Sequence, residues 1–372
     1  MIEAEPETVP LAQPVLGAQE EERVLAVLRS GQLSLGPQLA EFERAFALRL
    51  GIAHASAVSS GTAGLHLALR AVGVKDGDEV VTSPFSFVAS ANAVIYERAR
   101  PVFADIDPMT LNLAPDAAAA AVTGRTTALL PVHIFGYPAD LPALERLGLP
   151  IVEDACEALG AVHGDGIAVG ARGHPAVFGF YPNKQLTTGE GGIITTADAG
   201  IKVCVDSERN QGRSPDMGWL DHDRLGFNYR LSDIACAIGL GQLERLDAML
   251  ADRTAVAQLY RDALAEVDGL ELPCPDSGGD RRGWFVFVIQ LPREFDRDET
   301  VRALAERGIQ SKPYLPAIHL MSFYRERYGH RVGQFPVCED VAARSVALPF
   351  FPAMTEGQVG RVVQALRAVL GR

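Results

Sequence analysis

The sequence predicts an α/β fold in which a mostly parallel sheet is flanked by helices and is followed by a smaller α+β domain at the C-terminus. Three observations support this prediction. Short β-prone segments alternate with helical segments between residues 55 and 153, the pattern of a parallel sheet with crossover helices. A long helical stretch follows at 231–264. Beyond it, strand-like and helical segments are mixed, as in an α+β domain.

The strands predicted for the large domain are short apolar runs. They lie at residues 55–58, 79–82, 101–103, 128–132 and 150–153. Between them, apolar residues at helical spacing predict helices at 63–72, 87–96, 115–122 and 140–147. In such folds, ligands bind beyond the carboxyl ends of the strands, where loops and helix N-termini converge. We therefore expect the functional residues in the loops that follow these strands.

The second half of the chain contains the predicted link between the two domains. One more strand is expected at 192–196, and the helix at 231–264 has Ser232 or Asp233 as its N-cap. A loop rich in Gly, Pro and Asp follows at 269–283, and the remaining predicted elements are a strand at 284–291 and helices at 297–307 and 355–370. The chain thus divides into an N-terminal segment at 1–36, a large domain at 37–245 and a small domain at 246–372.

Composition narrows the possible functions of the 372-residue chain. Its net charge of −13 argues against nucleic acid as the main partner, because a phosphate backbone is bound by clustered Lys and Arg. The five cysteines are widely spaced and no His cluster has ligand spacing, so we expect a reduced protein without a metal site. No secretory signal pattern or membrane-spanning apolar run is visible, and a cytoplasmic location is expected.

Lys184 lies between aromatic residues and a glycine-rich turn, within the segment 178–192. A lysine condenses with an aldehyde only as the free amine, so a catalytic lysine needs a site that restricts solvent. Phe180 and Tyr181 could restrict solvent, and the glycines allow the backbone to approach a cofactor closely. On these residues alone, a lysine that binds pyridoxal phosphate and a solvated surface lysine are both open.

Two other segments have residues suited to an anionic, aromatic cofactor. Ser60, Gly61, Thr62 and Ala63 follow a predicted strand and open a helix, so their N–H groups and the helix dipole favour a phosphate. A simple helix cap explains the same residues. Asp154 follows an apolar strand, where a carboxylate is costly to bury without a cation such as a protonated pyridine nitrogen. A helix-capping Asp is the alternative.

The segment around Lys184 resembles the lysine motif of the DegT/StrS aminotransferases, which are fold-type-I pyridoxal phosphate enzymes that aminate nucleotide-linked keto sugars. The resemblance runs from about residue 14 to about residue 367 and includes, in the family's order, segments at 33–37, 59–66, 153–158, 228–233 and 313–319. It implies that the large domain binds pyridoxal 5′-phosphate. It also implies that Lys184 forms the internal aldimine and, once displaced, moves the substrate proton.

The resemblance assigns roles to several residues around the cofactor. The loop from Ser60 to Ala63 would hold the phosphate, and Phe87 would stack on the ring, with Phe85 as the alternative and core packing as the simpler explanation of either. Glu157 occupies a position where many members place Gln or His beside the phenolic oxygen of the cofactor. A carboxylate there would repel a phenolate unless it were protonated or turned away. Gly179 replaces a Ser that contacts the phosphate in many members.

Four further residues match the substrate side of the family's site. Asn228 and Arg230 match positions that reach across a dimer interface to the neighbouring cofactor phosphate and substrate, so a homodimer with shared active sites is expected. Tyr314 and His319 fall in the sugar-side segment. On sequence alone, Asn228 is more simply a turn residue before a helix, and Tyr314 and His319 are equally ordinary loop residues.

The implied reaction is a transamination with two substrates. Glutamate, or glutamine, gives its amino group to the cofactor, which passes the group to the ketone of a nucleotide-linked sugar. The same chemistry on a cyclitol or other polyol ketone is the alternative. A related sugar dehydratase is disfavoured because such members replace the lysine with histidine, whereas Lys184 is retained here. A non-catalytic, cofactor-binding regulator is the remaining alternative, but no helix-turn-helix or basic extension is evident.

Overall fold

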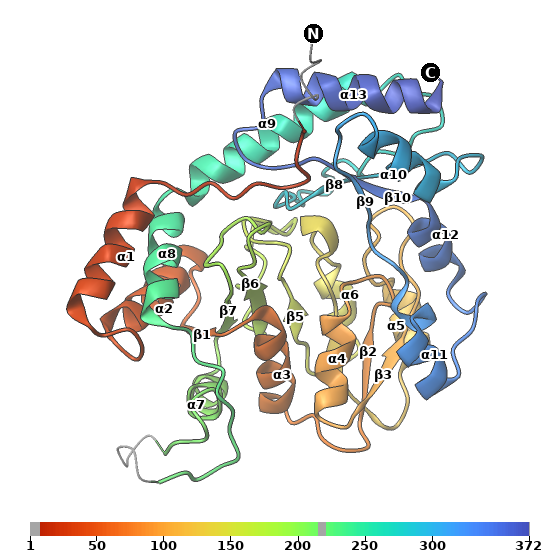
Figure 1. The fold of residues 1–372 in the computed structure, drawn as a ribbon. Helices are drawn as coiled ribbons and strands as arrows, with labels where there is room; N and C mark the ends of the chain where they lie inside the picture. Colours follow the sequence, from red (N-terminus) through yellow and green to blue (C-terminus); the bar gives the residue numbers. More distant parts are fainter. Residues whose placement is uncertain (1–7, 215–220, 372) are drawn as a thin grey trace.

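A computed structural model of the protein describes residues 8–214 and 221–371, and Figure 1 shows their arrangement. The larger of the two sheets is mostly parallel. Its strands are β1 (His54–Val58), β2 (Glu79–Thr82), β3 (Arg100–Phe103), β4 (Thr126–Leu130), β5 (Glu153–Asp154), β6 (Ala176–Gly179) and β7 (Gly192–Thr196). The strand orders β3-β2-β4 and β5-β6-β7-β1 are joined by the parallel bridges Leu129–Ile151 and Val132–Asp154. The α/β prediction with a mostly parallel sheet is confirmed, and β7 runs antiparallel to both of its neighbours.

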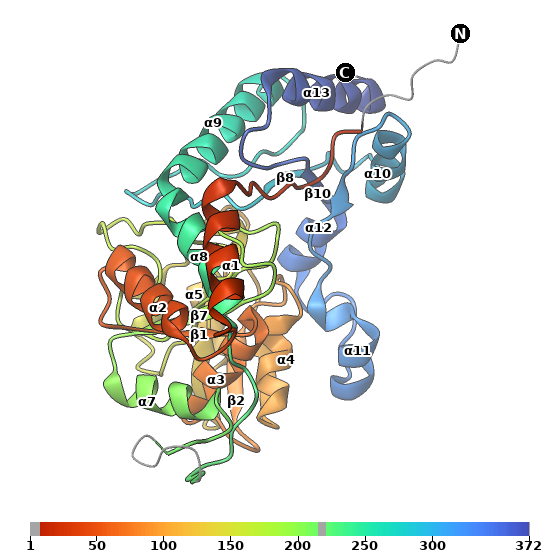
Figure 2. The same ribbon diagram turned by 60° about the vertical axis from the view of Figure 1, so that its left-hand side comes forward.

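Helices pack around this sheet. They are α2 (Pro37–Leu50), α3 (Gly61–Ala71), α4 (Ala89–Tyr96), α5 (Pro115–Ala121), the 3₁₀ turn η1 (Ile134–Gly136), α6 (Leu141–Glu145) and α7 (Ala199–Glu208). The helix α1 (Ala18–Ser30) lies beside α8 (Asp233–Glu244), as Figure 2 shows. Strands β2 and β7 have the predicted bounds. The prediction omitted α1, α2, β6 and α7. It also continued the strand of β4 to residue 132 and began the strand of β5 at residue 150, in stretches that form only isolated bridges.

The helix predicted at 231–264 is in fact two helices, α8 and α9 (Leu246–Leu264), and this prediction was wrong. Ser232 is the N-cap of α8, because its hydroxyl accepts a hydrogen bond from the backbone N–H of Ala235. Between the helices, Arg245 leaves the helical conformation with φ −105° and ψ 2°. Its guanidinium donates to the carboxylate of Glu20 and to the carbonyl of Val15, so the junction is tied to the N-terminal segment.

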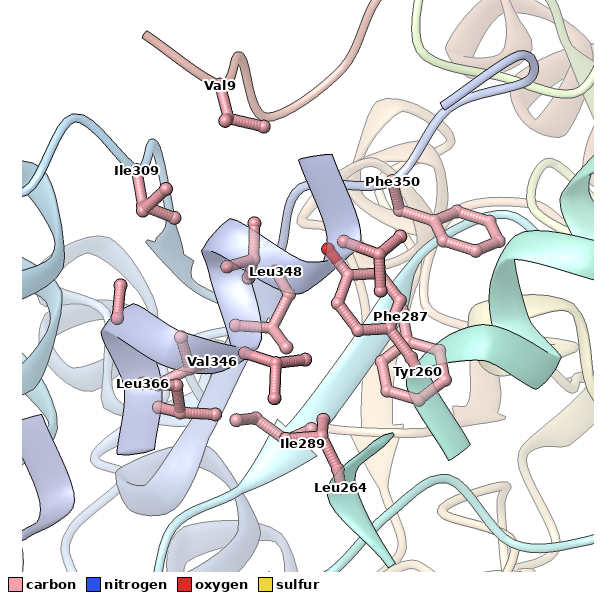
Figure 3. Close-up of a cluster of buried hydrophobic side chains, with 14 of the residues drawn as sticks. Val9, Tyr260, Leu264, Phe287, Ile289, Ile309, Val346, Leu348, Phe350 and Leu366 are labelled. Atoms are coloured by element: carbon pink, nitrogen blue, oxygen red, sulfur yellow. The ribbon is translucent and has the colours of Figure 1, made fainter. Parts of the chain in front are cut away.

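The C-terminal part forms a second, antiparallel sheet in the order β8-β10-β9. Its elements are β8 (Phe287–Gln290), α10 (Arg297–Ala305), β9 (Lys312–Pro313), η2 (Ile318–Leu320), α11 (Ser322–Tyr328), α12 (Pro336–Arg344), β10 (Ser345–Leu348) and α13 (Glu356–Leu370). Figure 3 shows the apolar cluster that joins this sheet to α9 and α13. Val9 belongs to the same cluster and pairs with Ile309, so the N-terminal segment packs on the C-terminal sheet. The division of the chain at residues 36 and 245 stays a prediction.

Candidate active site

A cavity of about 480 Å³ lies at the carboxyl ends of the parallel strands. The loops after β1, β2, β4, β5 and β6 converge there, which is where ligands bind in open α/β sheets. Eight of the residues that the sequence assigns to the site line this cavity: Ser60, Gly61, Thr62, Phe87, Asp154, Glu157, Lys184 and Tyr314. The fold therefore brings residues from distant parts of the sequence together around one cavity.

The first turn of α3 forms one wall of the cavity. The Ser60 hydroxyl accepts a hydrogen bond of 3.1 Å from the N–H of Ala63, so this N–H is already used within the turn. The N–H groups of Gly61 and Thr62 belong to the first turn and have no acceptor within the helix. A Cβ at Gly61 would lie 2.8 Å from Cys156 Sγ, so a larger residue there would force the Cys156 side chain to move. The helix dipole and these donors suit the phosphate of a cofactor.

Asp154 lines the cavity and is 5% exposed. Its Oδ2 accepts a hydrogen bond of 2.6 Å from the Ser90 hydroxyl, and its Oδ1 accepts one of 3.2 Å from the N–H of Cys156. No ion pair to Asp154 is present within residues 8–214 and 221–371. Because a buried carboxylate is costly without a cation, a protonated pyridine nitrogen fits the site.

Lys184 lines the same cavity from the loop after β6, with 15% of its side chain exposed. Its Nζ is 3.5 Å from Glu157 Oε1 and 3.9 Å from the centroid of the Phe285 ring. A carboxylate and an aromatic face both attract an ammonium group. The lysine is therefore held in the cavity by two residues that are distant from it in the sequence.

Arg253 fixes the backbone around this lysine. It is 3% exposed, and its guanidinium donates to the carbonyls of Lys184 at 3.1 Å and Phe285 at 3.0 Å. Burial lowers the pKa of Arg253 to about 10. The sequence prediction omitted both Arg253 and Phe285. A signal for Arg253 was present, because it falls on the buried stripe of α9 between Met249 and Val256, where a charged residue is unexpected.

Glu157 is 5% exposed and is turned toward Lys184 and the loop after β4. Its Oε2 accepts a hydrogen bond of 3.0 Å from the N–H of Phe135. Burial raises the pKa of Glu157, while Lys184 and the Phe135 N–H act in the opposite direction. The Tyr314 side chain lines the same cavity, and burial together with the charge of Glu157 raises its pKa.

The positions of Phe87 and Phe85 favour Phe87 as the residue that would contact the cofactor ring. Phe87 is 61% exposed and lines the cavity, whereas Phe85 is fully buried and packs against Phe135 with ring centroids 5.7 Å apart. Phe87 is therefore the residue placed to meet a ring in this cavity. Its stacking on the cofactor stays a prediction.

Four of the sequence-assigned residues, Ala63, Asn228, Arg230 and His319, do not line the cavity of their own chain. Ala63 lies in the first turn of α3, where its N–H donates to the Ser60 hydroxyl. Asn228 is exposed and pairs with Asn210, to whose side-chain oxygen Arg230 donates at 3.0 Å. His319 is fully buried, with Nε2 3.0 Å from Glu339 Oε1. The roles of Asn228 and Arg230 in a neighbouring subunit's site stay predictions, and the geometry of a single chain gives no support to the role of His319.

Neither a metal site nor a membrane-spanning helix is found among the described residues. Within 8–214 and 221–371, no group of three or more His, Cys, Asp or Glu side chains is arranged to hold a metal ion. None of the helices described there combines the length and apolar character that crossing a bilayer requires.

Comparison with known proteins agrees with the site geometry. The DegT/DnrJ/EryC1/StrS aminotransferase family model matches residues 14–367. The spore coat polysaccharide biosynthesis protein SpsC of Bacillus subtilis (strain 168) is 35% identical over 387 residues, covering 100% of this chain and 99% of SpsC.

Solved structures show the same relationship. DesV from S. venezuelae and the aminotransferase TlmJ from Streptoalloteichus hindustanus each match with a TM-score of 0.91 and 34% identity, over 98% of this chain and 99% of theirs. Together with the lysine, the buried carboxylate and the helix N-terminus in one cavity, these matches confirm the resemblance. The chain belongs to the DegT/DnrJ/EryC1/StrS aminotransferase family and is a fold-type-I aminotransferase that depends on pyridoxal phosphate.

Proposed function

We propose that this aminotransferase moves an amino group from glutamate to the keto group of a nucleotide-linked sugar, in a homodimer with shared active sites. The observation that carries the proposal is the single cavity that contains Lys184, Asp154 and the N-terminus of α3. Relatives support a sugar acceptor. SpsC is named for polysaccharide biosynthesis, and CalS13 from Micromonospora echinospora, 30% identical with a TM-score of 0.89, is described as a sugar aminotransferase.

When bound, pyridoxal phosphate supplies an aldehyde and an electron-withdrawing ring through which an amino group is accepted and returned. Asp154 would keep the ring nitrogen protonated. A charge pair near contact distance, at an effective dielectric of about 20, contributes on the order of several kcal/mol. The N–H groups of Gly61 and Thr62 would bind the phosphate, and Phe87 would cover one face of the ring. The Lys184 amine would take the proton from the substrate carbon and return it to the neighbouring atom.

The charges around the cavity support a shared site. The described residues that line it include three carboxylates, Asp154, Glu157 and Glu190, and one cation, Lys184. Glutamate and a nucleotide diphosphate are both anionic, so their binding needs positive charge that this wall of the site lacks. The Arg230 side chain does not reach the cavity of its own chain and binds Asn210 instead. In this proposal, Arg230 of a second copy supplies the missing positive charge.

The acceptor class is tested by comparing three ketones with glutamate as the donor: a nucleotide keto sugar, the matching free keto sugar and a cyclitol ketone. Binding energy from the remote nucleotide orients the carbonyl beside Lys184, so its removal should lower kcat/KM by about a hundredfold or more. The half-reaction with glutamate serves as the control, since it does not involve the acceptor. Equal or better turnover of the cyclitol ketone would support that alternative instead.

The shared site is tested by mixing two inactive variants, Lys184→Ala and Arg230→Ala, under conditions of subunit exchange. If each site takes Lys184 from one chain and Arg230 from the other, a heterodimer has one intact site. Random exchange of equal amounts should then restore about a quarter of the wild-type activity, because half of the dimers are mixed. Proven exchange without any recovery would contradict the proposal.

A further inference from the structure

The carboxylate of Glu157 contacts the nitrogen atom on which the reaction depends. Glu157 Oε1 is 3.5 Å from Lys184 Nζ, and both side chains are mostly buried, with 7% and 15% exposure. The other carboxylate oxygen, Oε2, accepts a hydrogen bond from the N–H of Phe135. This bond holds the carboxylate in its orientation toward Lys184. The side chain is thus turned toward the lysine by contacts on both of its oxygens.

The groups that face Glu157 come from several elements. Lys184 is on the loop after β6, Asp154 and Cys156 are at the end of β5, and Tyr314 comes from the segment after β9. Lys184 is the cation among these groups. Burial keeps Cys156 and Tyr314 neutral by raising the pKa of each side chain. The charge of Glu157 therefore acts mainly on Lys184.

We infer that Glu157 is a catalytic residue that controls the reactivity of the Lys184 nitrogen through direct contact with that nitrogen. A carboxylate at this distance stabilises the ammonium form, whereas a neutral amide would not. The amine must be free to attack the cofactor or to take a proton from the substrate. Glu157 thereby affects how readily Lys184 attacks the cofactor and takes a proton from the substrate. A Gln or a His at this position would not place the same negative charge beside the lysine.

The inference rests on the aminotransferase chemistry and is independent of the acceptor, so it is tested on cofactor-free protein. The measurement is the rate at which an acylating reagent modifies Lys184 as a function of pH, followed by peptide mass spectrometry. The exposed Lys75 is the internal reference. Glu157→Gln removes the charge but leaves an amide oxygen to accept the Phe135 hydrogen bond, so the local fold has its acceptor.

In Glu157→Gln, Lys184 should be acylated about tenfold or more faster at neutral pH, because the ammonium form loses its neighbouring carboxylate. Glu157→Asp keeps the charge but withdraws it by one methylene, and its rate should fall between the two. Glu190→Gln is the matched control, because this exposed carboxylate lines the same cavity but has no ion pair with Lys184 in the described structure. Its rate should equal that of the wild type.

A second readout uses the reconstituted holoenzyme, in which the pH midpoint of the visible absorbance should also fall in Glu157→Gln. An acylation rate of Lys184 in Glu157→Gln equal to that of the wild type would overturn the inference. Equal acceleration in Glu190→Gln would overturn it as well, because the effect would then be one of general cavity charge. Neither outcome depends on which acceptor the enzyme uses.

Discussion

Gly179 ends β6 on the wall of the cavity, and replacing it with serine should tighten cofactor binding. The residue faces Gly61 at the start of α3, where the phosphate is expected. A Cβ added at position 179 would lie 3.4 Å from Cys156 Cβ and Sγ and 3.9 Å from Gly61 Cα, which is ordinary van der Waals contact. No positive φ opposes a side chain there. The site thus has room for a hydroxyl beside the phosphate cradle.

The size of the effect follows from the bond that the hydroxyl would form. A hydrogen bond to a charged group contributes roughly 1.5–3 kcal/mol. That range corresponds to a decrease in the Kd for pyridoxal phosphate of about tenfold to a hundredfold. Gly179→Ala adds the same Cβ without the hydroxyl, so it should change the Kd little and raise the stability of the free protein by about 0.4–1 kcal/mol.

The assay is equilibrium titration of cofactor-free protein, followed by the quenching of its intrinsic fluorescence. Pyridoxal, which lacks the phosphate, is the matched ligand control and should bind Gly179→Ser and the wild type alike. Two results would refute the reasoning. One is an equal Kd for the Ser and Ala variants, and the other is an equal gain in affinity for pyridoxal, because either would show that the hydroxyl does not contact the phosphate.

Three other predictions follow from buried polar groups. Asp154→Asn keeps the Ser90 contact but removes the counter-charge, so the glutamate half-reaction, followed by absorbance, should slow by about a hundredfold or more; a near-wild-type rate would contradict this role. His163 is 3% exposed, and burial, with a smaller contribution from His133, lowers its pKa to about 4. Between pH 6.5 and 4 the unfolded chain binds a proton at His163 that the folded protein does not, so the free energy of unfolding should fall by roughly 3 kcal/mol as the pH falls through that window. Urea unfolding of His163→Asn should therefore depend less on pH than that of the wild type. An equal pH dependence in the two proteins would argue against this role of His163. Arg253→Met leaves the carbonyls of Lys184 and Phe285 without this donor, which should lower the unfolding free energy by about 1–3 kcal/mol for each carbonyl and slow the glutamate half-reaction. Arg253→Lys should recover part of the stability and part of the rate. Full activity with normal stability in Arg253→Met would show that Arg253 does not position Lys184.

Local sequence patterns pointed to several residues that line the cavity. The cap and helix start at Ser60, the acid after an apolar strand at Asp154 and the lysine before a glycine-rich turn are each contained in a few residues. Such short-range signals depend on backbone propensity and capping, which act within one or two turns of chain. The same reasoning identified β2 and β7 with their bounds, because both strands are short apolar runs with turn residues beside them.

The contacts around Lys184 were decided by the tertiary structure. Glu157 and Phe285 meet its Nζ from two different parts of the fold, and Arg253 reaches its carbonyl from α9. Such contacts depend on the register of neighbouring strands and on the packing of α9 against the sheet, which no local window of sequence contains. The break at Arg245 has the same origin, because its guanidinium binds a segment from the opposite end of the chain. The sequence by itself pointed to the residues proposed for the chemistry, and tertiary packing determined which neighbours contact the lysine, because those neighbours come from distant parts of the chain.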